Sequence, residues 1–133
     1  MAIILDADVI IKGEKGKFDL IAWLDAQTGQ DLEIAAITIA ELWHGIERAT
    51  APHRARRERY LRAIVEGSET IPYTETTALV HAELWAELES SGNMIGAHDL
   101  ILAATALERG SVVATFNKRH FSQVRELKVI EPA

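Results

Sequence analysis

Hydrophobic residues in this chain follow two patterns, short uninterrupted runs and longer stretches in which they recur every three or four positions. The short runs at residues 2–5, 32–37 and 111–115 predict buried β-strands. The longer stretches are typical of helices that bury one face. They predict helices over residues 18–29, 38–49, 52–67, 75–90 and 98–110. Two shorter extended segments are predicted at residues 69–73 and 127–131.

The alternation of strands and helices predicts an α/β fold with a central parallel sheet. Helices that connect parallel strands cover both faces of such a sheet. We expect four to five strands in a single domain over residues 1–133, because no repeat or linker divides the chain. The helix at residues 98–110 is apolar on nearly every side, which predicts a central position.

The composition narrows the class of protein. The absence of cysteine excludes disulfides and thiolate metal sites, and it favours a cytoplasmic protein. No signal peptide is predicted, because the first apolar run follows no basic segment and is interrupted by Asp6 and Asp8. The apolar runs are too short to cross a bilayer, so we expect no membrane association.

The net charge of −6 argues against indiscriminate binding of nucleic acid. Basic residues nevertheless gather in two regions, and such regions can hold a phosphate chain locally. A solvated helix face or a contact with a partner protein explains the first region equally well. The first region contains Arg48, Arg54, Arg56, Arg57, Arg59 and Arg62, and the second contains Lys118, Arg119, Arg125 and Lys128.

Polar residues stand where the predicted strands end. Asp6 follows the first strand, Glu41 lies one turn into the helix after the second, and Asp99 opens the central helix. Thr115 and Asn117 stand at the end of the strand at residues 111–115. Ligands of open parallel sheets bind beyond the carboxyl ends of the strands. We therefore expect these side chains to meet at one edge of the sheet.

Each acidic residue also has a purely structural explanation. Asp6 or Asp8 could cap a short helix, Thr38 and Glu41 fit a capping box, and Asp99 suits the positive end of a helix. As a cluster, however, two carboxylates at ~5 Å and an effective dielectric constant of ~20 repel each other by roughly 3 kcal/mol. A divalent cation removes that repulsion, and carboxylate and amide oxygens suit Mg²⁺ or Mn²⁺.

Four segments of the chain carry a resemblance to a known family. The segments ILDADVI, AITIAELWHGI, AHDLILAATAL and VVATFNKRHF, in this order over the whole length, resemble the PIN-domain ribonucleases. They are most similar to the VapC-type toxins of bacterial toxin–antitoxin pairs. The resemblance implies a single PIN-like domain that hydrolyses RNA phosphodiester bonds with Mg²⁺ or Mn²⁺.

The resemblance also assigns residues and partners. It implies that Asp6, Glu41 and Asp99 are catalytic and bind the metal, with Asn117 as a weaker ligand at a position where the family often has aspartate. We interpret Asp8 as a residue that supports the site or caps a helix. The resemblance further implies a homodimer and a cognate VapB-type antitoxin whose tail blocks the acidic site.

Basic residues and histidines add to this assignment. Lys118 and Arg119 are candidates for holding the RNA backbone, as phosphate contacts generally do. His98 adjoins Asp99 and either touches the substrate or is a hydrogen-bonded neighbour of the acidic site. His98 and His120 could instead perform acid–base catalysis without a metal.

Two other functions remain open from the residues. Asp6 and Asp8 match the strand end of haloacid-dehalogenase-type phosphatases, in which the first aspartate is the nucleophile. That chemistry needs a later glycine–aspartate pair at another strand end, which this chain lacks. The other alternative is a non-catalytic PIN-like module that binds RNA or protein and uses its carboxylates as helix caps. Dependence of RNA cleavage on metal separates this module from the enzyme.

Overall fold

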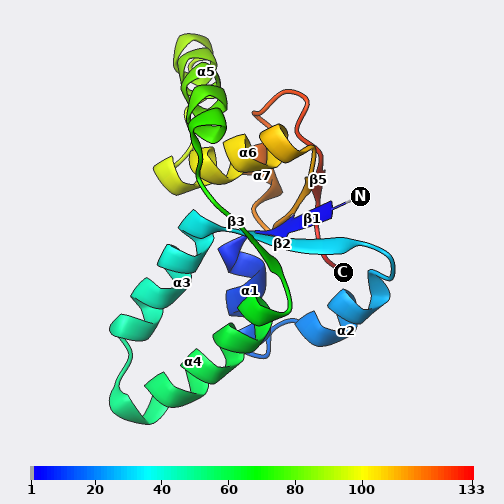
Figure 1. Ribbon diagram of the computed structural model, residues 1–133, viewed down its shortest axis with the longest axis vertical. Coiled ribbons are helices and arrows are strands. Elements are labelled where there is room, and N and C mark those ends of the chain that lie inside the picture. Colours follow the sequence, from blue (N-terminus) through cyan, green and yellow to red (C-terminus); the bar gives the residue numbers. More distant parts are fainter. Residues whose placement is uncertain (1) are drawn as a thin grey trace.

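A five-stranded parallel sheet forms the centre of the computed structural model, which describes residues 2–133 (Figure 1). The strand order is β3-β2-β1-β4-β5, and each neighbouring pair is parallel. The prediction of an α/β fold with four to five parallel strands is confirmed. The strands are β1 (Ala2–Leu5), β2 (Asp31–Ala35), β3 (Glu69–Ile71), β4 (Val112–Ala114) and β5 (Val129–Ile130).

Helices cover both faces of the sheet, as predicted. Helices α1 to α4 lie on one face, below the sheet in Figure 1, and α5 to α7 lie on the other. Each face has its own apolar core, one built with Leu42 and Leu61 and the other with Leu88 and Leu102. The helices are α1 (Ala7–Glu14), α2 (Leu20–Ala26), α3 (Ala36–Glu47), α4 (Ala51–Glu66), α5 (Glu75–Ser91), α6 (Ala97–Arg109) and α7 (Lys118–Phe121).

Helix α6 is the central helix that the apolar stretch at residues 98–110 predicts. Ala103, Ala104 and Ala106 are fully buried, and their small side chains let the helix lie close to the sheet. The helix ends at Gly110, whose φ of 66° is the left-handed conformation that glycine adopts without strain. The position of α6 brings Asp99, in its first turn, to the carboxyl end of the sheet.

Two short helices were not predicted as elements. Helix α1 follows β1 after Asp6 alone, so the strand and the helix read as one apolar run in the sequence. Helix α7 has four residues, too few for a periodic pattern. Its Phe121 is fully buried in the core. Helix α2 is also shorter than the predicted segment 18–29.

The capping box proposed for Thr38 and Glu41 is wrong. Helix α3 begins at Ala36, directly after β2, and Ala35 is the residue at its N-cap. Thr38 therefore lies inside the first turn, fully buried, and its hydroxyl has no hydrogen-bond partner among the described residues. Glu41 is one turn further along the helix and is free of a capping role.

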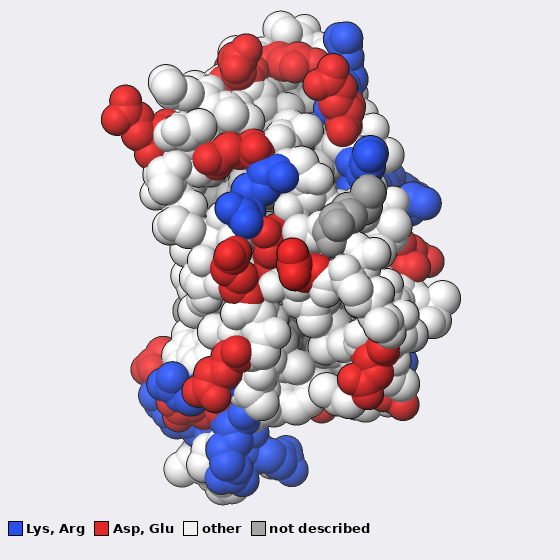
Figure 2. Space-filling model, turned by 45° about the vertical axis from the view of Figure 1, so that its right-hand side comes forward, with Lys and Arg blue, Asp and Glu red and all other residues white. Residues whose placement is uncertain are grey.

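Charged side chains are unevenly distributed over the surface. On the face in Figure 2, the largest group of Lys and Arg side chains lies at the lower end, where α3 and α4 meet in Figure 1. Acidic side chains occupy the middle and the top of the same face. None of the helices within residues 2–133 is both long and apolar enough to cross a membrane.

Candidate active site

Asp6 lies at the switch point of the sheet, where β1 is flanked by β2 on one side and by β4 on the other. Its backbone N–H donates to Ala114 O (3.0 Å), which places it beside the end of β4. Ala7 N donates to Asp6 Oδ1 (2.8 Å), and Thr115 Oγ1 donates to Asp6 Oδ2 (2.8 Å). Asp6 is therefore the N-cap of α1. Each carboxylate oxygen has a second lone pair, so the cap leaves Asp6 able to bind a cation as well.

Asp8 lies beside Asp6 in the first turn of α1 and is half-buried. Phe116 N donates to Asp8 Oδ2 (3.1 Å), so Asp8 fastens the segment after β4 to the start of α1. The Thr115 hydroxyl lies between the two aspartates and accepts a hydrogen bond from Asn117 N (2.9 Å). These bonds fix the positions of Asp6 and Asp8 relative to β4.

Asp99 faces the same edge from the first turn of α6. Its Oδ2 lies 3.4 Å from Nδ1 of His120, which is carried by α7. Asn117 Nδ2 lies 2.7 Å from the same ring nitrogen and, as an amide nitrogen, donates to it. The structure thus brings Asp99, Asn117 and His120 together, and it places the exposed Lys118 and Arg119 on the same short helix.

Glu41 reaches this edge from α3, and His98 of α6 lies beside it. His98 Nδ1 lies 3.7 Å from Glu41 Oε2. A hollow of about 470 Å³ opens beside this pair and is lined also by Ile11 and His44. The sequence places His98 next to Asp99, whereas His44, on a predicted helix, was interpreted as structural. The spacing of Glu41 and His44, three residues apart on one helix, is the signal that could have indicated their shared side.

The carboxylates act on one another electrostatically. Burial raises the pKa of Asp6 from 3.8 to about 7, and the charges of Asp8 and Asp99 contribute to the increase. Burial likewise raises the pKa of Glu41, with Asp99 and Asp8 contributing and His98 opposing. The pKa of Asp8 is also raised by burial. All four groups therefore lie in one negative field, which includes Asp8, the residue interpreted from the sequence as supporting the site or capping a helix.

The oxygens at this edge are the donors that Mg²⁺ and Mn²⁺ prefer. Across residues 2–133, however, no three Asp, Glu, His or Cys side chains are arranged closely enough to hold a metal ion as they stand. Asp6 is fixed by its hydrogen bonds, whereas Glu41 and Asp99 retain exposed surface and room to move. The residue types and the shared field fit a divalent cation, provided that these two side chains turn toward Asp6.

Comparisons with known proteins identify the family. A family model described as "PIN domain" matches residues 3–127. The chain belongs to the PIN-domain family. Among curated PIN-domain relatives, "VapC ribonuclease Y4jK" of Sinorhizobium fredii is 34% identical over 139 residues, with 98% of this chain and 96% of the relative covered. The "tRNA(fMet)-specific endonuclease VapC" of Salmonella typhimurium is 35% identical over 100 residues, which cover 72% of this chain and 71% of that protein.

A solved PIN-domain structure agrees over the whole fold. The DNA-bound VapBC complex from Salmonella typhimurium contains a chain that is 26% identical to this one, with a TM-score of 0.89 and 98% of each chain covered. This PIN domain is thus of the VapC type. The resemblance to VapC-type toxins, which four sequence segments carry, is therefore confirmed. Because the chain belongs to this family, the alternative function as a haloacid-dehalogenase-type phosphatase has no support.

Proposed function

We propose that this PIN domain is a metal-dependent endoribonuclease and the toxin of a VapBC-like toxin–antitoxin pair. The observation that carries the proposal is the position of Asp6, Glu41 and Asp99. The three carboxylates reach the switch point of a PIN fold from three different elements, and the charge of Asp99 contributes to the raised pKa of both Asp6 and Glu41. The names of the curated relatives, which include ribonucleases and a tRNA endonuclease, support RNA as the substrate class.

We assign the metal ligands to Asp6, Glu41 and Asp99, with Asn117 as a weaker fourth. When bound, Mg²⁺ or Mn²⁺ would lower the pKa of a coordinated water and offset charge on the phosphodiester. Asp6 is the fixed member of the set, because Ala7 and Thr115 hold its two oxygens. The amide nitrogen of Asn117 is engaged by His120, which leaves the amide oxygen for a cation or a water.

Neighbouring residues support this set. Asp8 holds the segment after β4 in place through Phe116 N, and His98 lies where it can orient Glu41 or contact the substrate. Lys118 and Arg119 are exposed on α7 beside the acidic edge, where cations would hold the phosphate groups that flank the cut. Their role is to position the strand, because phosphate contacts carry no base information.

The same proposal includes partners and location. A VapB-type antitoxin would silence the toxin by placing a cation, such as an arginine side chain, among the carboxylates. A homodimer would bury the exposed aromatic side chains of Tyr73 and Trp85, which flank His81 on and beside α5. The cytoplasm, where RNA and antitoxin are available, is the expected location.

RNA cleavage in the presence and absence of metal tests the function. The purified protein should cleave RNA with Mn²⁺, lose the activity in chelator and regain it when Mn²⁺ is restored. Asp6→Asn, Glu41→Gln and Asp99→Asn should each reduce cleavage by orders of magnitude at unchanged folding. Binding of RNA without metal-dependent cleavage would instead identify the non-catalytic module. Cleavage that survives chelation but is lost in His98→Ala or His120→Ala would point to histidine chemistry.

A further inference from the structure

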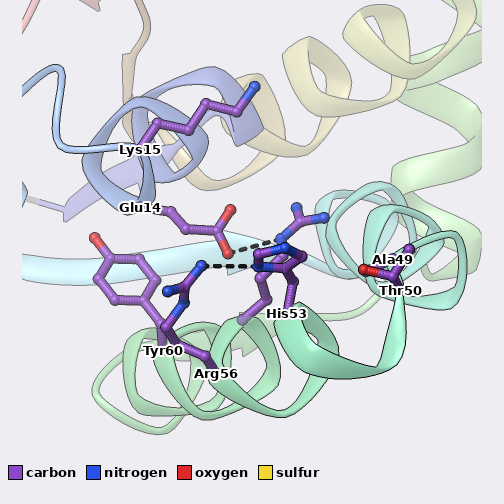
Figure 3. A pocket seen from close by; sticks show the side chains of 8 residues that line it. Glu14, Lys15, Ala49, Thr50, His53, Arg56 and Tyr60 are labelled. Carbon is purple, nitrogen blue, oxygen red and sulfur yellow. Dashed lines mark hydrogen bonds and ion pairs between the residues drawn. The ribbon is translucent and has the colours of Figure 1, made fainter.

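A second cavity, of about 700 Å³, lies between the end of α1 and the connection from α3 to α4 (Figure 3). Its walls include Glu14 and Lys15 from the end of α1 and its following turn, and His53, Arg56, Arg57 and Tyr60 from α4. We refer to this cavity as the basic pocket. It shares no lining residue with the hollow beside Glu41.

The acidic residue of the basic pocket is already neutralised. Arg57 Nε donates to Glu14 Oε2 (2.9 Å), and the Glu14 side chain is only 10% exposed. Another nitrogen of the same guanidinium, Nη1, donates to Gly45 O (3.1 Å), so Arg57 joins α1, α3 and α4. Any side chain at Gly45 would crowd this guanidinium, since a Cβ there would lie 3.2 Å from Arg57 Nη2. Arg57 and Glu14 therefore hold the wall of the pocket together.

Lys15 and Arg56 remain as uncompensated positive charges. Neither forms an ion pair with another of the described residues, and both are exposed. Arg56 Nη2 donates to His53 Nδ1 (3.1 Å), and this bond holds the guanidinium beside His53, as Figure 3 shows. Thr50, at the positive end of α4, also lines the pocket and makes no capping bond. The pocket is thus positively charged within a protein of net charge −6.

The basic pocket and the acidic edge lie along the same pair of helices. Helix α1 contributes Ala7 and Ile11 to the hollow beside Glu41 and Lys15 to the basic pocket. Helix α3 contributes Glu41 to that hollow, and Ala49, just beyond its end, lines the basic pocket. Eight residues separate Glu41 from Ala49, which corresponds to about 12 Å at 1.5 Å per residue of helix.

We propose that the basic pocket binds a phosphate group of the RNA strand whose cut bond lies at the acidic edge. The inference rests on the proposed ribonuclease function and extends it. Four clustered carboxylates repel a phosphate chain, so the strand must be held by cations elsewhere on the protein. Lys15 and Arg56 supply such cations a few nucleotides away. An acidic protein segment is the competing ligand, and the alignment of the pocket with the acidic edge favours the nucleic-acid strand.

Binding of a labelled single-stranded RNA in chelator, where no cleavage occurs, tests the proposal. The test variant is the double substitution Lys15→Gln and Arg56→Gln. The matched control is Lys17→Gln with Arg59→Gln, which removes the same charge from the same two segments outside the pocket. All four side chains are exposed, so both variants should fold.

The pocket variant should bind the RNA about tenfold more weakly, whereas the control should stay within about twofold of the wild type. The slope of log affinity against log salt should fall by about 0.7 for each phosphate contact that is lost. In cleavage with Mn²⁺, the pocket variant should raise KM for a long RNA and leave kcat unchanged.

Equal RNA affinity of the pocket variant and the control would overturn the proposal, as would a wild type that binds no RNA. Unchanged RNA binding with loss of binding to an acidic antitoxin peptide would assign the pocket to a protein partner. The ribonuclease function is judged separately. Absence of metal-dependent cleavage by the wild type would refute that function. Normal cleavage, together with equal RNA affinities of the pocket variant and the control, would refute only the binding of RNA phosphate by the basic pocket.

Discussion

The hydroxyl of Thr115 donates to a carboxylate oxygen of Asp6 at 2.8 Å, although the two residues are 109 positions apart in the chain. Both are buried, one at the end of β1 and the other at the end of the neighbouring strand β4. The bond opposes the rise in the pKa of Asp6 that burial causes. Thr115 thus orients the central carboxylate and favours its ionised form.

Thr115→Val should remove this support while keeping the shape of the side chain. The loss of one such supporting bond typically lowers metal affinity or activity about 10- to 100-fold. Thr115→Ser retains the hydroxyl and should stay close to the wild type. Cleavage rates measured over a range of Mn²⁺ concentrations distinguish the variants. If Val and Ser at this position gave the same metal dependence, Thr115 would have only a packing role.

Asn117→Asp should strengthen metal binding. It introduces a carboxylate in place of the weaker amide ligand of the proposed set, and more ligand charge raises affinity for divalent cations. The Mn²⁺ concentration that gives half-maximal activity should fall by about tenfold, the equivalent of about 1.4 kcal/mol. Asn117→Ala should weaken cleavage less than Asp99→Asn does. An Asn117→Asp variant with unchanged metal dependence would remove Asn117 from the proposed ligand set.

The metal-free protein should lose stability as the pH rises from about 4 to about 7. The folded-state pKa of Asp6 is about 7, against 3.8 as its ordinary value. Within this interval the unfolded chain releases the proton that the folded protein keeps, so ionisation favours unfolding. A shift of this size corresponds to an effect on the order of 4 kcal/mol. Below pH 4 both states are protonated and the effect is absent.

Asp6→Asn is the control for this pH dependence, because the amide does not titrate. Urea unfolding in chelator at a series of pH values should show a flatter profile for the variant. The comparison isolates Asp6 from the other carboxylates, which titrate in both proteins. If the stability of the wild type depended on pH as little as that of the variant, the pKa of Asp6 would not be raised in the folded protein.

A homodimer that uses the aromatic side of α5 should dissociate when a charged residue replaces Trp85. Trp85 is 48% exposed and stacks on His81, and His81 in turn contacts the hydroxyl of Tyr73 at 2.8 Å. Leu79→Glu is the matched control, because Leu79 is 65% exposed but lies on another side of the helix, two residues from His81. Light scattering after size exclusion should report a monomer for Trp85→Glu and a dimer for Leu79→Glu. The reverse pattern would place the interface elsewhere on α5.

The edge to which Asp6, Glu41, Asp99 and Thr115 converge could be predicted, because parallel strands end at the same side of a sheet. The start of α1 directly after β1 and the start of α3 at Ala36 were not predicted, although Asp6 was a candidate for a helix cap. Asp6 ends β1 and caps α1, so one residue separates two elements whose apolar side chains form a single pattern. The contact of His98 with Glu41 was likewise hidden, since it depends on the angle between α3 and α6 and not on spacing within either helix.

Metal should stabilise the wild type, and Asp99 should be needed for this effect. A ligand at a hundredfold excess over its dissociation constant stabilises a folded protein by about 2.7 kcal/mol. The stabilisation follows from the repulsion among Asp6, Glu41 and Asp99, which Mn²⁺ or Mg²⁺ would relieve. Asp99→Asn removes one of these charges, so in chelator the variant should be at least as stable as the wild type. In excess metal the variant should gain much less stability than the wild type does.

Thermal unfolding of both proteins, with chelator and with Mn²⁺, measures the two effects. A helix cap would behave in the opposite way, because the loss of a cap costs about 1 kcal/mol regardless of metal. Asp99 lies in the third position of α6 behind the Gly96 N-cap, and that cap makes no side-chain bond, so Asp99 is well placed to separate the two roles. A wild type that ignores metal, together with an Asp99→Asn variant destabilised in chelator, would assign Asp99 to the helix and remove it from the metal site.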